Sequence, residues 1–423
     1  MKKIAIIGAG IAGLTAAFRL SKKGHIVKII EKEKDIGGVM GSVNIDGFQI
    51  EKYYHHVFVG DDELFRLVEE LGIKNKMKEI RTKTGFYYKN KLYNLSGALD
   101  LIKYRPLSVL DRLRLGLFML KIKGIKDAER YSTEPLREWV IKNSNERIYE
   151  KVFLPLLRSK YGNRVDDVST AWFIERMKIR AQRGAKGETL IYMSGGFQQL
   201  LDRLQEEIIK NGGKILTGKD VQRITTDGTI IKKLKYDSKE ESFDFVISTI
   251  PPETLNSKID IPTGVKENEY QGALCILLGL KKSLCEYYWT NIVSDEKISF
   301  GAYIEHTNMI PKSEYGGNVI SYLASYPDSG SDIWNMSDAE IFKKYFNDLK
   351  KFFDVSDSDV VFWKVFKTRY AGLVYKKGLT KEIMQCRTKI PNLFVCGMFN
   401  SYPERSINLS IKLANECACL VGD

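Results

Sequence analysis

The fold is decided by the stretch KIAIIGAGIAG at residues 3–13, where a β-branched apolar run meets three closely spaced glycines. The run before the glycines predicts a buried strand, and residues 14–20 have the composition of a helix. Gly8 permits a tight turn, Gly10 lets a phosphate approach the backbone, and Gly13 lets helix and strand pack closely. The stretch therefore predicts a strand, a glycine turn and a helix whose N-terminus holds the pyrophosphate of a dinucleotide.

The next segment contains a residue suited to recognise the ribose. Gly24 ends the predicted helix, residues 25–30 form a second strand, and Glu31 follows 23 positions after Gly8. An acidic residue at this spacing accepts hydrogen bonds from ribose hydroxyls. Its charge would repel a 2′-phosphate, so these residues favour an adenosine ribose with free hydroxyls and argue against NADP.

A later pair of glycines distinguishes between the two remaining candidate cofactors, NAD and FAD. Gly37 and Gly38, within residues 31–41, resemble the second glycine motif of FAD-dependent amine oxidases and their relatives. Their use would be to bring backbone N–H groups close to the cofactor, where a Cβ would clash. An ordinary glycine loop is the alternative. We expect FAD as the cofactor, held in this part of the chain by Gly8, Gly10, Ile11, Ala12, Gly13, Glu31, Lys32, Gly37 and Gly38.

Further stretches resemble the amine oxidase superfamily, which includes protoporphyrinogen oxidase, phytoene desaturase and, more distantly, UDP-galactopyranose mutase. Residues 191–197 precede an amphipathic helix and a strand, and Val221 follows. The resemblance implies that this region returns to the cofactor domain and that backbone groups of Val221 meet the adenine. Residues 243–252 resemble the strand that leads out again to the substrate domain.

The C-terminal part of the chain carries the last resemblance. Residues 392–398 resemble the family's final strand, which normally ends in Gly-Asp, but here Met398 follows Gly397. One expected polar contact to the ribityl chain is therefore missing, and either Asn400 or backbone groups would supply it. Residues 404–414 resemble the loop entering a helix whose N-terminus faces the flavin ring. The resemblance implies ring contacts from Ser406, Ile407 and Asn408, with simple packing of a terminal helix as the alternative.

The 423 residues are enough for two or three packed units. The resemblance implies an α/β fold in which a discontinuous Rossmann-like FAD-binding domain carries an inserted α+β substrate domain. Residues 1–80, 190–260 and 365–423 would form the cofactor domain. Residues 81–189 and 261–364 would form the substrate domain.

Histidine is scarce, with four residues in the chain. His55 and His56 lie where the superfamily brings the chain toward the reacting edge of the flavin, and His306 lies in the second insertion. We expect these three to be the catalytic candidates, orienting substrate or moving a proton. Satisfied structural histidines are the alternative. No metal is expected, because no His, Cys and carboxylate cluster has recurrent ligand spacing.

The net charge of +13 invites an anionic partner, but no cluster looks like a nucleic-acid arm. Residues 101–126 mix apolar and basic side chains, which would suit a helix on an anionic membrane. The alternative is a core helix with a basic exposed face. A second basic stretch, residues 158–183, would either clamp a phosphate or be the solvated face of a helix over residues 170–182.

These features predict an FAD-dependent oxidoreductase that takes a hydride from a C–H or C–N centre of a small, lipid- or glycan-linked substrate. The alternatives are a redox-neutral flavin mutase acting on a nucleotide sugar and a flavin-bound scaffold without turnover. Met1-Lys2-Lys3 leads directly into the first strand, and the six cysteines suggest no disulfide framework. We therefore expect a cytoplasmic protein, peripheral to the inner face of the membrane through residues 101–126.

Overall fold

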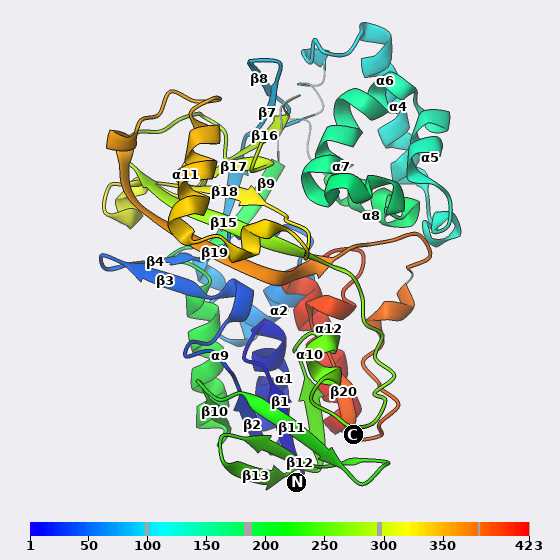
Figure 1. The fold of residues 1–423 in the computed structure, drawn as a ribbon, viewed down its shortest axis with the longest axis vertical. Coiled ribbons are helices and arrows are strands. Elements are labelled where there is room, and N and C mark those ends of the chain that lie inside the picture. The colour runs from blue at the N-terminus through cyan, green and yellow to red at the C-terminus, as the bar shows by residue number, and fades with distance from the viewer. Residues whose placement is uncertain (98–99, 101, 182–187, 294–297, 380, 423) are drawn as a thin grey trace.

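The chain forms three regions, each with its own pattern of secondary structure (Figure 1). One region is built on a parallel sheet and contains both termini, a second is built on a larger mixed sheet, and a third is helical. The computed structural model describes residues 1–97, 100, 102–181, 188–293, 298–379 and 381–422.

The parallel sheet gathers strands from distant parts of the sequence. Its order is β10 (Lys214–Leu216), β2 (Ile26–Ile30), β1 (Lys3–Ile7), β14 (Phe245–Ser248) and β20 (Leu393–Val395), with every neighbouring pair parallel. The sequence predicted a strand in each of these five regions; β2 begins one residue later than expected, and β14 and β20 are shorter than the stretches 243–252 and 392–398 that carry the resemblance. Its helices include α1 (Ile11–Lys22), α2 (Asp62–Glu70), α9 (Gln198–Lys210) and α12 (Ile407–Gly422). Helix α1 packs against α9 and α12, and ten of its twelve residues are buried.

The carboxyl ends of β1, β14 and β20 lie at one edge of this sheet. The Thr249 N–H donates to the carbonyl of Ile7 (2.9 Å), and the Cys396 N–H donates to the carbonyl of Ser248 (3.1 Å). The turns after the three strands are therefore neighbours. In open α/β sheets this edge is where ligands bind.

Smaller elements surround the parallel sheet. An antiparallel sheet contains β11 (Val221–Thr226), β12 (Ile231–Tyr236) and β13 (Lys239–Ser242), and α10 (Pro252–Asn256) follows β14. A hairpin joins β3 (Ser42–Ile45) to β4 (Phe48–Glu51). A third group pairs β5 (Val57–Phe58), β9 (Glu188–Met193) and β6 (Met77–Thr82).

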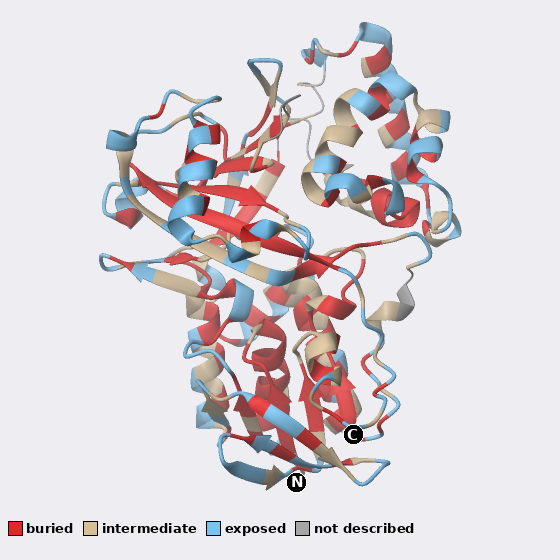
Figure 2. Cartoon of the chain, in the orientation of Figure 1, coloured by how far each residue is buried: buried red, intermediate tan, exposed pale blue. Residues whose placement is uncertain are grey.

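The larger sheet has seven strands. Their order is β19 (Val360–Leu373), β15 (Tyr270–Leu280), β18 (Val319–Ser325), β17 (Ala302–Glu305), β16 (Trp289–Val293), β7 (Thr84–Tyr88) and β8 (Lys91–Asn94), antiparallel except between β16 and β7. Every residue of β15 is buried, and α11 (Asp338–Leu349) packs against β19 (Figure 2). Strand β19 continues to Leu373, so residues 365–373, which were expected in the cofactor segment, belong to this sheet.

The third region is helical. It contains α4 (Val109–Gly124), α5 (Leu136–Asn143), α6 (Glu146–Ile148), α7 (Leu154–Tyr161) and α8 (Thr170–Ala181), with a π-helical turn between α6 and α7. Phe118 of α4 packs on Trp139 and Phe153, and Phe153 packs on Phe173 of α8. Leu101 of the basic segment lies outside the described residues. Of the helices that the structure describes, none is both long and apolar enough to cross a bilayer.

Candidate active site

The first glycine turn forms a cradle in which Gly8 and Gly13 are closely packed and Gly10 faces open space. A Cβ added at Gly13 would lie 2.0 Å from the carbonyl oxygen of Gly8, and Gly8 itself has a φ of +103°. A Cβ at Gly10 would meet no atom within 4 Å. Gly10 is the N-cap of α1, whose first N–H groups have no partner within the helix. The space in front of Gly10 thus fits a pyrophosphate, held by backbone N–H groups and the positive helix end.

Glu31 lies at the end of β2 beside this turn. Its buried carboxylate accepts the N–H of Ala9 (2.6 Å) and the N–H of Glu33 (2.9 Å). A carboxylate has about four acceptor positions, so two backbone donors orient Glu31 and leave acceptor capacity for ribose hydroxyls. Lys32, in contrast, is exposed, with its Nζ 3.5 Å from Glu33.

The second glycine pair lies directly against the first turn. The Gly37 N–H donates to the carbonyl of Ala9 (2.9 Å), and a Cβ at Gly38 would lie 3.7 Å from the Cα of Gly10. Both glycines have positive φ, +111° and +57°, which favours glycine over other residues. The tertiary fold thus joins two motifs that the sequence separates by more than twenty residues.

Val221 lies near the same strand end. It is buried at the start of β11, and the preceding Lys219 N–H donates to the carbonyl of Glu31 (2.8 Å). The Gly218 N–H likewise donates to the carbonyl of Glu33 (2.7 Å). The returning chain is therefore held beside the residue expected to recognise the ribose.

Gly397 and Met398 follow β20 at the same sheet edge as the first glycine turn. The Gly397 N–H donates to the side-chain oxygen of Asn400 (2.9 Å), and Asn400 is buried. A Cβ at Gly397 would lie 3.4 Å from the carbonyl oxygen of Thr249. Asn400 thus shapes the turn around Gly397, and Met398 is half-buried at the start of a short helical turn.

The start of α12 has two side chains with clear capping roles. The Ser406 hydroxyl accepts the N–H of Leu409 (3.1 Å). The Asn408 side-chain oxygen accepts the N–H groups of Glu63 (2.8 Å) and Leu64 (3.1 Å), and so caps α2. Ile407 between them is half-buried. Ser406 and Asn408 therefore fix the position of the helix N-terminus that we expected to face the flavin ring.

The three histidines occupy different surroundings. His55 Nδ1 lies 2.7 Å from the carbonyl of Tyr53, and burial lowers the pKa of His55 to about 4. His56 Nδ1 lies 2.9 Å from the hydroxyl of Tyr288. His306 is fully buried with Nε2 2.7 Å from the hydroxyl of Tyr315, and burial lowers its pKa to about 3. At neutral pH, His55 and His306 are thus uncharged and weak bases.

A buried carboxylate that the sequence analysis missed lies beside His306. Glu51, at the end of β4, accepts the hydroxyl of Tyr192 (2.8 Å) and the N–H of Phe197 (2.7 Å), and burial raises its pKa. The Tyr192 ring in turn lies 5.0 Å from the His306 ring. His306 therefore belongs to a buried polar network that joins β4 and β9 to the seven-stranded sheet.

A group of aromatic and basic residues gathers where the three regions meet. The hydroxyls of Tyr54 and Tyr326 are in contact, and the Arg405 guanidinium lies 5.0 Å from the centre of the Tyr326 ring. Arg405 also donates to the carbonyl of Ala371 (2.6 Å). None of these three residues was singled out from the sequence, because they come from segments more than 70 residues apart.

The same group extends into the helical region through Lys160. Its Nζ lies 4.7 Å from the Trp172 ring, and Trp172 stacks on Tyr375 at 5.7 Å. Burial lowers the pKa of Lys160 well below its ordinary range, and the charges of Arg176 and Arg405 add to this effect. Arg176 pairs with Glu404, next to Arg405 in the chain. We call Lys160, Arg176 and Arg405 the cationic cluster. Because Lys160 and Arg176 belong to the basic stretch at residues 158–183, part of that stretch faces the protein interior.

Asp61 is a further buried acid near this junction, and its ionisation should appear in the pH dependence of stability. It accepts the N–H of Phe58 (2.8 Å), and burial raises its pKa to about 6. Because the folded state holds this proton more tightly than the unfolded chain, the stabilising contribution is complete below about pH 4 and is lost as the pH rises through about 6.

We therefore expect the free energy of unfolding, measured by denaturant titration, to fall by about 2 kcal/mol more in wild type than in Asp61→Asn between about pH 4 and pH 6. The asparagine keeps the acceptor for Phe58 but does not titrate. Parallel curves for the two proteins would contradict the assignment.

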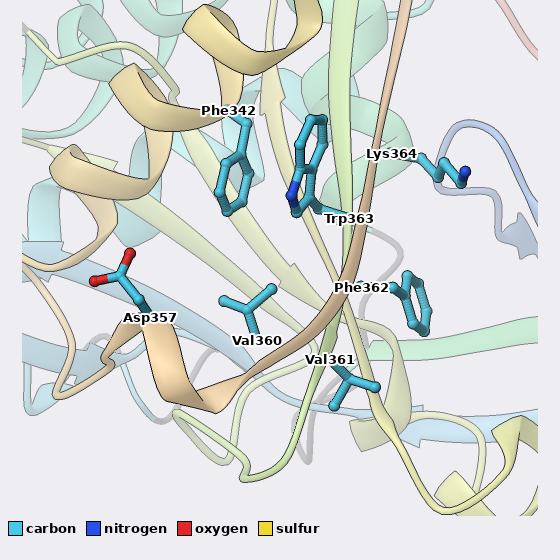
Figure 3. A pocket seen from close by; sticks show the side chains of 7 residues that line it. All are labelled: Phe342, Asp357, Val360, Val361, Phe362, Trp363 and Lys364. Carbon is cyan, nitrogen blue, oxygen red and sulfur yellow. The ribbon is translucent and has the colours of Figure 1, made fainter.

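A separate pocket lies on the outer side of the seven-stranded sheet. It has a volume of about 410 Å³ and is lined by Phe342, Asp357, Val360, Val361, Phe362, Trp363 and Lys364 (Figure 3). Phe342 and Trp363 stack on each other at 4.5 Å within it. It is built from α11, β19 and the turn before β19, and none of its lining residues belongs to the glycine turns. Within the described ranges, no group of three or more His, Cys, Asp or Glu side chains could hold a metal ion.

Comparison with known proteins agrees with these features. The sequence model of the family described as "Flavin containing amine oxidoreductase" matches residues 11–421. Zeta-carotene desaturase of Synechocystis sp. is 28% identical over 255 residues, which cover 54% of this chain and 51% of that protein. Mitochondrial protoporphyrinogen oxidase of Nicotiana tabacum is 24% identical over 295 residues, 59% of this chain and 58% of that protein. The chain thus spans little more than half the length of these curated relatives.

A solved structure extends the comparison to the whole fold. An oxidoreductase from Methanosarcina mazei superposes with a TM-score of 0.76 at 19% identity, and covers 98% of this chain and 100% of that one. At this identity the likeness concerns the fold alone.

Proposed function

The chain belongs to the flavin containing amine oxidoreductase family, whose cofactor is FAD, and from this membership we propose that it is an oxidoreductase removing a hydride from a C–H or C–N centre of a small organic substrate. The observation that carries the proposal is the cradle at Gly10. It is open where a pyrophosphate would lie and bordered by Glu31 and the second glycine pair.

We propose that FAD is held by residues expected from the sequence, in roles that agree with their contacts. Backbone groups of Gly10, Ile11, Ala12 and Gly38 would face the pyrophosphate, and Glu31 would face the ribose. Ser406 and Asn408 would act by fixing the start of α12. Bound FAD would supply the two-electron acceptor for the hydride. The parallel sheet, with its returning segments, would be the discontinuous Rossmann-like domain, and the other two regions would form the substrate domain.

The protein's own residues would orient the substrate and supply positive charge beside it. The cationic cluster and the tyrosines around it combine positive charge with apolar ring faces. This combination would suit a substrate with an apolar body and an anionic group, because Arg pairs strongly with carboxylate or phosphate where water is scarce. His56, hydrogen bonded to Tyr288, is the histidine that we retain as the candidate for positioning substrate or moving a proton.

The cationic cluster also keeps one alternative open. A redox-neutral mutase acting on a nucleotide sugar would need cations to grip a diphosphate, and the guanidinium groups of Arg176 and Arg405 could serve that purpose. In the proposed redox reaction the substrate reduces the flavin, whereas in the mutase reaction it does not.

The test is the visible spectrum of the purified protein supplemented with FAD. We expect a bound-flavin spectrum that bleaches anaerobically when a C–H or C–N substrate carrying an anionic group is added. Bleaching would exclude the mutase and the scaffold. Turnover of a nucleotide sugar only after dithionite reduction would favour the mutase, and absence of any bound flavin would overturn the whole proposal.

The proposal includes a cytoplasmic location and a peripheral membrane contact through residues 101–126. The structure describes residues 102–126 of this segment, which include α4.

A further inference from the structure

Helix α4 presents an apolar stripe to the outside. Side chains on one of its faces are 63–67% exposed, although all are large and apolar: Val109, Leu110, Leu113, Leu117 and Leu120. The opposite face, with Leu115, Phe118 and Ile122, is buried against the other helices of its region. Apolar residues thus lie on both sides of α4: the buried face fits the alternative of a core helix, but the exposed face is apolar as well as basic.

The stripe stands out against the rest of the molecule. Thirteen large apolar residues are exposed among the described residues, and six of them lie between residues 102 and 120. The sixth is Ile102, whose carbonyl accepts a hydrogen bond from Arg112, so the loop before α4 is tied to the helix. A contiguous exposed apolar surface on a folded protein marks an interaction site.

Basic side chains border the stripe on both sides. At 100° per residue, Arg114 and Lys121 lie along one edge of the exposed leucines, and Arg112 and Lys123 lie along the other. The helix has one acidic residue, Asp111, which is buried and pairs with Arg147 from outside the helix (3.3 Å) and with Arg114 of the helix itself (3.8 Å). The exposed face of α4 therefore combines apolar and positive groups without a negative one.

The apolar and basic side chains on the exposed face of α4 favour one kind of binding partner. We propose that α4 docks on an anionic lipid bilayer, lying along the surface with its leucine stripe among the acyl chains and its two basic edges at the headgroups. Its 16 residues form a rod of about 24 Å, shorter than a spanning helix but suited to the interface. A second copy of the chain is disfavoured as the occupant, because α4 against α4 would bring like charges together along both edges.

The docking inference specifies the membrane contact named in the proposed function but is independent of flavin chemistry. The measurement is flotation of the flavin-loaded protein with vesicles of phosphatidylcholine containing about 30% phosphatidylglycerol, compared with phosphatidylcholine alone. We expect binding to the anionic vesicles that weakens as salt is raised. The Leu113→Gln/Leu117→Gln variant should bind about tenfold more weakly or not at all, with its bound-flavin spectrum unchanged.

Two further variants make the result specific. Ile209→Gln/Val361→Gln removes two exposed apolar residues elsewhere, 54% and 48% exposed, and should bind vesicles like wild type. Arg114→Gln/Lys123→Gln keeps the stripe and should lose the preference for anionic vesicles. Equal vesicle binding by wild type and the leucine variant would overturn the inference. So would a wild-type dimer that the leucine substitutions dissociate, with no vesicle binding, because it would identify a second copy as the occupant.

Discussion

Replacing Gly10 by valine is expected to give a folded protein that does not bind FAD. The backbone of Gly10, with φ −71° and ψ 175°, is open to any residue, and a Cβ there meets no protein atom within 4 Å. The new side chain would instead fill the space proposed for the pyrophosphate. We expect affinity for FAD to fall by at least about 100-fold, equivalent to about 2.7 kcal/mol.

The measurement is fluorescence titration of the apoprotein with FAD, together with thermal unfolding with and without FAD. The variant's apoprotein should unfold at the wild-type temperature, but FAD should no longer raise that temperature. Gly60→Val is the matched control, because Gly60 also lacks neighbours within 4 Å of an added Cβ and lies outside the cradle. Wild-type FAD affinity in Gly10→Val would show that the pyrophosphate lies elsewhere.

Gly13 offers a contrast within the same turn. A Cβ at Gly13 would lie 2.0 Å from the carbonyl oxygen of Gly8, so even alanine requires the strand and helix to separate. We expect Gly13→Ala to destabilise the apoprotein itself, whereas Gly10→Val does not. The two substitutions thus distinguish a glycine needed for packing from one needed for ligand approach.

Replacing Arg405 by methionine is expected to abolish most turnover while FAD stays bound. Methionine keeps much of the apolar stem that packs against Gly372, where an added Cβ would come within 2.9 Å of Arg405 Cδ. It removes the charge that lies over Tyr326 and the hydrogen bond to Ala371. If the substrate carries an anionic group, losing a charge-assisted hydrogen bond of up to about 3 kcal/mol should lower kcat/KM by about 100-fold.

The measurement compares an acid substrate found by anaerobic bleaching with its methyl ester. Wild type should prefer the acid, and Arg405→Met should lose that preference, whereas Arg405→Lys should recover part of it. Arg369→Met is a matched control, because Arg369 also lies 5.0 Å from an aromatic ring, that of Trp334, and donates to a backbone carbonyl, that of Ser329 (2.6 Å). It is exposed and outside the cluster, so its loss should leave turnover unchanged. An unchanged acid preference in Arg405→Met would exclude the anion-binding role.

Much of the cofactor region could be predicted from the sequence because its signals are local. The strand, turn and helix around Gly8–Gly13 need only a β-branched run, spaced glycines and a helical segment, and the structure has them at Lys3–Ile7 and Ile11–Lys22. The histidines were harder to interpret. Neighbours that the sequence does not reveal determine whether a histidine is exposed, as the burial of His306 among Tyr192, Tyr315 and Tyr322 illustrates.

The family resemblance, the expectation of a flavin and most strands of the parallel sheet follow from local sequence, since glycine geometry and hydrophobic periodicity act over a few residues. The use of the positive charge depends on the folded chain. The fold turns Lys160, Arg176 and Arg405 inward to one junction and leaves the leucines of α4 exposed between two basic edges. Both arrangements depend on contacts between segments far apart in the chain, and an amphipathic pattern alone does not specify which face the rest of the protein covers.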